Sequence, residues 1–105
     1  MLRLDYDKLV RDKIPEIIEA SGKKYVIENC NSPQEINRRL IEKLEEEGNE
    51  FLESNEIEEL ADLLQIVYSL IENNSWELGD IEKIRTEKQA ARGGFSKGII
   101  LKKVE

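Results

Sequence analysis

Two consecutive stretches of helical periodicity, separated only by Ser54 and Asn55, constrain the fold of this chain more than any other feature. Across residues 36–52 and again across residues 57–71, apolar side chains recur at steps of three and four, which places them on one face of a helix. Ser32 followed by Pro33 is a typical helix start. The pattern predicts two long antiparallel helices, of which the second is apolar around much of its circumference and is expected to be largely buried.

The remaining sequence predicts shorter elements around this pair. Pro15 fits only the first turn of a helix, so we expect a helix that begins near Ile14 and ends at Gly22. A further helix is expected over residues 78–91. Residues 24–28 and 98–104 are rich in branched apolar side chains and read as two short strands that pair. The expected fold is mainly α, an antiparallel helix bundle with a small peripheral β element, in one domain over residues 1–105.

Composition narrows the classes of function. The net charge of −7 argues against a nucleic acid polymer as partner, because phosphate contacts need an excess of Lys and Arg. The chain has one cysteine, which excludes an internal disulfide, and no histidine, the usual zinc ligand and general base. No apolar run is long enough for a membrane span, and we expect a soluble cytoplasmic protein. A chain of 105 residues leaves many apolar side chains half covered, so self-association is expected.

Four acidic residues form the most informative constellation. Glu47 and Glu50 lie three apart on the first long helix, and Glu59 and Asp62 lie three apart on the second, so each pair shares a helix face. If the chain reverses between Ser54 and Asn55, Glu50 faces Glu59 and Glu47 faces Asp62. Two like charges about 4 Å apart repel by roughly 4 kcal/mol at an effective dielectric near 20, so a cation is needed there.

Mg²⁺ fits this constellation, since it prefers oxygen ligands and is often bound jointly by carboxylates and substrate phosphates, and Mn²⁺ is a substitute. The metal would polarise a phosphoryl oxygen and acidify a water nucleophile. Glu46 is a further candidate, either as a general base or as a residue that supports the metal ligands without binding the metal itself. The spacing alone is equally compatible with a solvated acidic helix face.

The charges are sorted along the chain in a way that suits a phosphate substrate. Residues 42–62 hold ten acids and one base, a balance of −9, whereas residues 83–103 hold seven bases and one acid, a balance of +6. Basic residues beside a metal-binding site stabilise the negative charge that builds up on a departing pyrophosphate. We therefore expect Lys88 and Arg92, just before Gly93, to bind the substrate.

The acidic motifs and both flanks together resemble the MazG-like family of all-α nucleotide pyrophosphohydrolases, in particular its phosphoribosyl-ATP pyrophosphohydrolase-like subgroup. The motifs are Glu46-Glu47-Gly48-Asn49-Glu50 and Glu58-Glu59-Leu60-Ala61-Asp62, flanked by Lys8-Leu9-Val10-Arg11-Asp12-Lys13-Ile14-Pro15 and Arg92-Gly93-Gly94-Phe95. The resemblance covers nearly the whole chain. Only eight residues separate Glu50 from Glu59, fewer than is usual in the family, which implies a tight hairpin and a small or differently built base pocket.

The resemblance implies specific roles. Glu47, Glu50, Glu59 and Asp62 would coordinate Mg²⁺, with Glu47, Glu50 and Glu46 counted as catalytic, and Lys43, Arg11 and Lys13 would bind substrate together with Lys88 and Arg92. Water would attack the α-phosphorus of a nucleotide and release the monophosphate and pyrophosphate. The resemblance also implies a homodimer or homotetramer in which helices of different subunits complete the pocket.

Two other functions remain open from the sequence. A phosphoribosyl-ATP pyrophosphohydrolase of histidine biosynthesis shares the chemistry and differs in its substrate. A non-enzymatic helical association module would carry the same acids as solvated surface residues.

Overall fold

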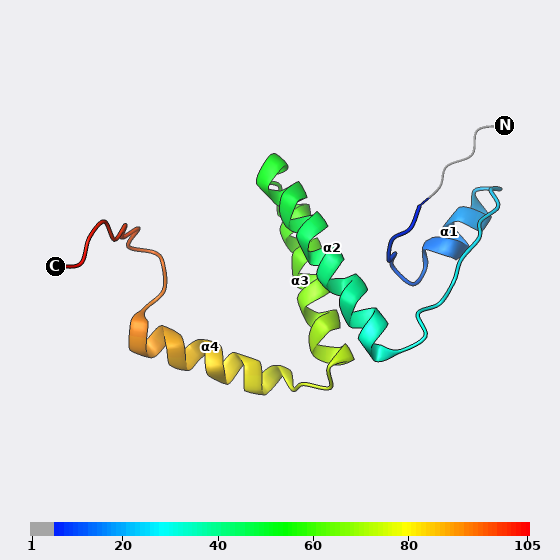
Figure 1. The fold of residues 1–105 in the computed structure, drawn as a ribbon. Helices are drawn as coiled ribbons and strands as arrows, with labels where there is room; N and C mark the ends of the chain where they lie inside the picture. Colours follow the sequence, from blue (N-terminus) through cyan, green and yellow to red (C-terminus); the bar gives the residue numbers. More distant parts are fainter. Residues whose placement is uncertain (1–5) are drawn as a thin grey trace. The chain divides into compact units, whose positions relative to one another are not determined.

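The computed structural model describes residues 6–105, and within this range it contains four helices and no strand. The helices are α1 (Ile14–Ala20), α2 (Pro33–Ser54), α3 (Ile57–Asn73) and α4 (Leu78–Arg92), and α2 and α3 pack against each other as an antiparallel hairpin (Figure 1). The predicted mainly α fold is therefore confirmed. None of the helices in residues 6–105 combines the length and the apolarity that crossing a lipid bilayer requires.

The chain divides into two compact units, Met1–Ser75 and Trp76–Glu105. The first unit contains α1, α2 and α3, and the second contains α4 with the C-terminal segment. No residue of the second unit is buried, so this unit has no core of its own. That residues 1–105 form a single domain stays a prediction.

The predicted β element is not formed within residues 6–105. Residues 24–28 and 98–104 have no regular secondary structure, and their apolar side chains lie in solvent, with Val26 98% and Ile99 81% exposed. A strand is stable only when its backbone N–H and C=O groups bond to a neighbouring strand. Branched residues favour an extended backbone, but without such a partner they do not make a strand.

The helix boundaries follow the capping signals of the sequence. The hydroxyl of Ser32 accepts a hydrogen bond from the Glu35 backbone N–H at 3.1 Å, and the Glu35 carboxylate accepts one from the Asn31 N–H at 3.0 Å, so the first turn of α2 is closed. At its other end, Asn55 adopts a left-handed conformation with φ of 54° and donates its N–H to the Phe51 carbonyl at 2.8 Å. The chain therefore reverses at the predicted position.

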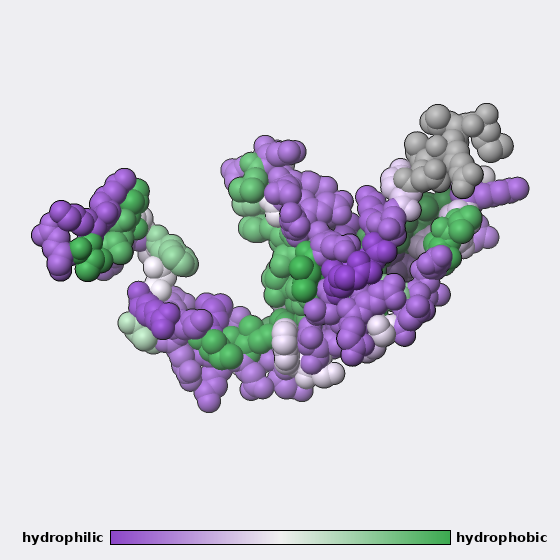
Figure 2. All heavy atoms as spheres, viewed as in Figure 1, coloured by the Kyte–Doolittle hydropathy of each residue, from purple (hydrophilic) through white to green (hydrophobic). Residues whose placement is uncertain are grey.

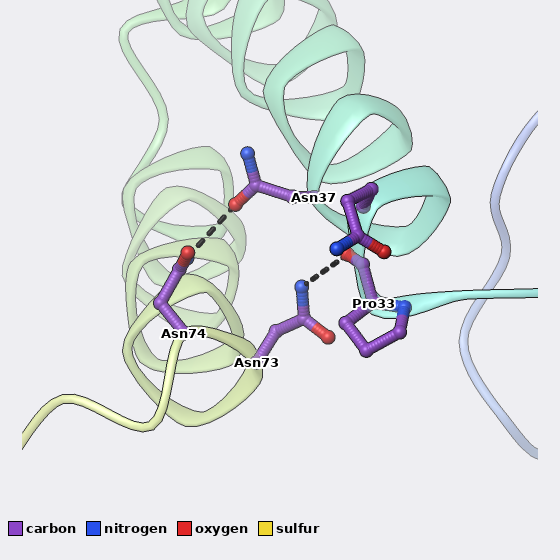
Figure 3. A pocket seen from close by; sticks show the side chains of 5 residues that line it. Pro33, Asn37, Asn73 and Asn74 are labelled. Atoms are coloured by element: carbon purple, nitrogen blue, oxygen red, sulfur yellow. Dashed lines mark hydrogen bonds between the residues drawn. The ribbon is translucent and has the colours of Figure 1, made fainter.

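The far end of the hairpin is held by amide side chains (Figure 3). Asn73 donates from Nδ2 to the Pro33 carbonyl at 2.9 Å, and Asn74 donates to Oδ1 of Asn37 at 2.8 Å. Together with Gln34 these residues line a shallow cavity of about 230 Å³. The bonds join the start of α2 to the end of α3 and fix the register of the two helices.

Helix α3 is much less buried than its apolar sequence predicts. Only Ile66 and Ile71 of this helix are buried. Leu60 and Leu64, on the side turned away from α2, are each 51% exposed. Within residues 6–75 a single helix, α2, packs along α3 and covers one face of it. The sequence showed that α3 is apolar on two faces, but one neighbour cannot cover both.

Candidate metal centre

Glu47 is the one charged residue that is buried within residues 6–105, with 8% of its surface exposed. It lies on the face of α2 that packs against α3, in a position where the helical pattern calls for an apolar side chain. Leu40 is the other buried residue of α2, two turns earlier. The predicted acidic residue on the core side of the hairpin is therefore present.

The predicted metal ligands come together around Glu47. A carboxylate oxygen of Glu47 lies within 4.8 Å of oxygens of Glu46 and Glu50, and likewise within 4.8 Å of oxygens of Glu59 and Asp62. Glu47 thus belongs to two carboxylate groups, one on α2 alone and one across the hairpin. Glu50 is exposed and belongs only to the first group, whereas Glu59 and Asp62 are half-buried and belong only to the second.

The surroundings of Glu47 disfavour its charged form. Its Oε2 atom is buried and receives no hydrogen bond from any other described residue. Burial raises the pKa of Glu47, and the Glu50 carboxyl raises it further because it lies close enough to share a proton and repels a second charge. Lys43 opposes this rise with its ammonium group 3.5 Å from Oε1 of Glu47. A buried carboxylate oxygen without a donor is the kind of atom that a cation satisfies.

Within residues 6–105, three cations lie against these carboxylates. Lys43 is 3.7 Å from Glu46 as well as close to Glu47, and its side chain is only 19% exposed. Arg11 donates from Nη2 to Oδ1 of Asp62 at 2.7 Å, across 51 residues of sequence. The structure therefore brings two predicted substrate-binding cations, Lys43 and Arg11, to the predicted metal ligands.

The third cation, Lys8, was not singled out by the sequence. Its ammonium group lies 3.8 Å from Oε1 of Glu46. Arg39 was also missed, and it binds both the carboxylate of Asp7 at 2.8 Å and the Asp7 carbonyl at 3.2 Å. The hydrogen bond and the charge of Asp7 raise the pKa of Arg39. Both contacts join residues more than 30 positions apart, and periodicity within one helix carries no signal for them.

Within residues 6–105, no ion pair or hydrogen bond joins the other predicted substrate-binding residues to the carboxylates. Lys13 precedes α1 and is exposed, and it makes no ion pair within residues 6–105. Lys88 and Arg92 lie on α4 in the second unit and are exposed there. Their predicted roles stay predictions.

The donor set fits a hard divalent cation. All candidate ligands are carboxylate oxygens from two helices that the hairpin holds in register, and one of these oxygens is buried without a donor. Mg²⁺ is held by carboxylates jointly with water and substrate phosphates, which suits a site that is buried at Glu47 and open at Glu50. Glu47, Glu50, Glu59 and Asp62 are the residues that would hold it, and that all four bind one ion stays a prediction.

The raised pKa of Glu47 predicts an unusual pH dependence of stability in the metal-free protein. In the unfolded chain this carboxyl titrates near its ordinary value of 4.5, and in the folded chain it titrates at higher pH. Between these two values the folded state binds more protons, so the free energy of unfolding contributed by Glu47 falls as the pH rises. In EDTA, a Glu47→Gln variant should lose this fall and become more stable than the wild type on the alkaline side. Urea unfolding across this pH range measures the difference, and parallel curves for the two proteins would contradict it.

Comparisons of the chain with protein-family models, with curated proteins and with solved structures found no match.

Proposed function

We propose that this protein is a Mg²⁺-dependent nucleotide pyrophosphohydrolase that cleaves a nucleoside triphosphate to the monophosphate and pyrophosphate. The observation that carries the proposal is Glu47, a buried carboxylate with an unpaired oxygen that belongs to carboxylate groups on both helices of the hairpin. A solvated acidic face, the alternative that the sequence left open, does not explain why a charge is buried. The resemblance of the acidic motifs to the MazG-like family supports the reaction type.

Each residue of the site has a role in this proposal. Glu47, Glu50, Glu59 and Asp62 hold the metal, which when bound supplies a Lewis acid that withdraws charge from the phosphoryl oxygens. Glu46, half-buried beside Glu47, accepts a proton from the attacking water.

The cations of the site are assigned to the substrate. Lys43 stands one turn before Glu47 on α2 and orients phosphate oxygens. Arg11 also lies at the carboxylates, because it forms an ion pair with Asp62. A guanidinium forms two parallel hydrogen bonds to a phosphate, whereas the lysine acts as a point charge, so the two side chains supply different contacts. Both counter the negative charge that accumulates on the departing pyrophosphate.

We further propose that the protein works as a homodimer or a larger homo-oligomer. The outer face of α3 forms an apolar groove of about 520 Å³, lined by Ile57, Leu60, Ala61, Leu63, Leu64 and Val67. Figure 2 shows apolar atoms gathered along this side of the hairpin. Since only Leu40, Ile66 and Ile71 form the apolar core of residues 6–105, this face is large relative to the core. The same face on a second copy covers it symmetrically.

A free nucleotide as substrate and a single unpaired cysteine fit a cytoplasmic enzyme. The exposed apolar face of α3 is the one observation that also favours a non-enzymatic association module. The two functions differ in what they require of the acids. An association module has no use for a carboxylate buried between its helices, whereas the enzyme needs it.

The direct test is product analysis. With Mg²⁺ and a panel of nucleoside triphosphates, the protein should release equal amounts of nucleoside monophosphate and pyrophosphate, and EDTA should stop the reaction. Anion-exchange chromatography separates these products from the diphosphate and inorganic phosphate that a γ-phosphatase yields. Release of inorganic phosphate alone, or no turnover of any nucleotide, would contradict the proposal.

A further inference from the structure

The segment over residues 6–13, here called the N-terminal strap, is joined to the hairpin by ion pairs. Asp7 binds Arg39 of α2 at 2.8 Å, and Arg11 binds Asp62 of α3 at 2.7 Å. Lys8 approaches Glu46 of α2 at 3.8 Å. The strap thus reaches both helices of the hairpin through charged side chains, ahead of the first turn of α1.

Two of these three contacts involve the candidate metal centre. Glu46 belongs to the carboxylate group on α2, and Asp62 belongs to the group across the hairpin. The strap therefore supplies one cation to each group, Lys8 to the first and Arg11 to the second. The third contact, between Asp7 and Arg39, lies outside both groups and anchors the start of the strap.

Lys8 and Arg11 neutralise part of the negative charge of the carboxylates when no metal is bound. Glu47 and its neighbours repel one another, and a guanidinium at 2.7 Å from Asp62 offsets part of that repulsion through a charge-assisted hydrogen bond. A divalent cation held by the same carboxylates repels the guanidinium and competes with it for the oxygens of Asp62. The side chains of Arg11 and Asp62 are 58% and 39% exposed, so the pair is accessible and weak enough to exchange.

We infer that the N-terminal strap is an internal counter-ion that competes with the divalent metal, so that metal binding releases Arg11 from Asp62 and frees its guanidinium for the substrate phosphates. This inference rests on the proposed function, since it requires a metal at the carboxylates. Arg11 would thus couple metal binding to phosphate binding. The guanidinium becomes available to phosphate only when the metal that activates the phosphate is in place.

The first test compares Arg11→Gln with Lys24→Gln, a matched loss of one positive charge at an exposed residue outside both carboxylate groups and outside the substrate-binding set. Mg²⁺ binding is measured by isothermal titration calorimetry without nucleotide. Arg11→Gln should bind Mg²⁺ about three- to fivefold more tightly than the wild type, because an exposed ion pair that competes with the metal is gone. Lys24→Gln should change the affinity by less than about twofold, because its charge acts only through a screened field.

The second test uses the wild type, so it does not depend on the folding of a variant. Hydrogen–deuterium exchange of the backbone amides in residues 6–13 should rise when Mg²⁺ is added, whereas exchange in the middle of α2 and α3 should not. If the wild type binds Mg²⁺ but Arg11→Gln binds it equally or less well, or if the strap becomes more protected, the strap does not compete and the proposed function still stands. If neither protein binds Mg²⁺, the strap inference and the metal assignment both fail.

Discussion

Replacing Glu47 by Gln should lower the rate of Mg²⁺-dependent pyrophosphate release by about 100-fold or more, since a bound metal supplies several kcal/mol of transition-state stabilisation and each tenfold is about 1.4 kcal/mol. The same substitution should leave the metal-free protein at least as stable as the wild type. Its buried charge is removed, and the Gln amide has nearly the same volume. Loss of activity without loss of stability would separate a ligand from a residue that only supports the fold. Pyrophosphate release with a coupled assay and thermal unfolding in EDTA measure the two effects.

Glu53→Gln is the matched control for this experiment. Glu53 lies on the same helix with its side chain exposed, and it belongs to neither carboxylate group. Its substitution makes the same chemical change and should leave the rate within about twofold, since a solvated charge away from the site is screened. Equal rates for wild type and Glu47→Gln would overturn the assignment of Glu47 as a ligand, and equal losses in both variants would point to net charge instead of a site.

Replacing Leu64 by Glu should convert the oligomer to monomers. Leu64 is 51% exposed on the outer face of α3 and lines the apolar groove, so a carboxylate there disturbs the isolated chain little. In a symmetric dimer the lost apolar contact occurs twice, at about 2 kcal/mol each, which corresponds to about a thousandfold in the dissociation constant. Sedimentation velocity at micromolar concentration measures the change.

Leu52→Glu provides the control for the interface. Leu52 lies on α2, is 80% exposed and does not line the groove, so the same substitution there should leave sedimentation unchanged. A wild-type protein that sediments as a monomer, or a Leu64→Glu variant that sediments as the wild type does, would show that a second copy does not cover this face. Activity measured on the same samples shows whether the pocket depends on the oligomer.

Much of the hairpin was predictable because its signals are local. Ser32 caps α2 and Asn55 ends it in a left-handed conformation. Glu47 lies near Asp62 as predicted, whereas Glu50 and Glu59, which were predicted to face each other, belong to different carboxylate groups. The same local logic placed Glu47 on the packed side of α2. The helix that begins at Ile14 and the end of α4 before Gly93 were also predicted correctly.

The errors came from interactions that depend on a partner. The sequence predicted strands at 24–28 and 98–104 because branched residues favour an extended backbone, but a strand also needs a neighbour to bond with, and none pairs with these segments within residues 6–105. It predicted a largely buried α3 because the helix is apolar on two sides. Burial of the second side requires something other than α2 to cover it.

The sequence by itself determined the helices, the reversal between them and the presence of acidic residues at matching positions, since each of these follows from spacing along one or two adjacent elements. Only the tertiary structure decided the environment of those acids. It showed that Oε2 of Glu47 is buried without a hydrogen-bond donor, that Asp62 is half-buried, and that Arg11 reaches Asp62 across 51 residues. The physical reason is that pKa values, desolvation and long-range ion pairs depend on which distant groups share a volume, and this information is absent from the local pattern.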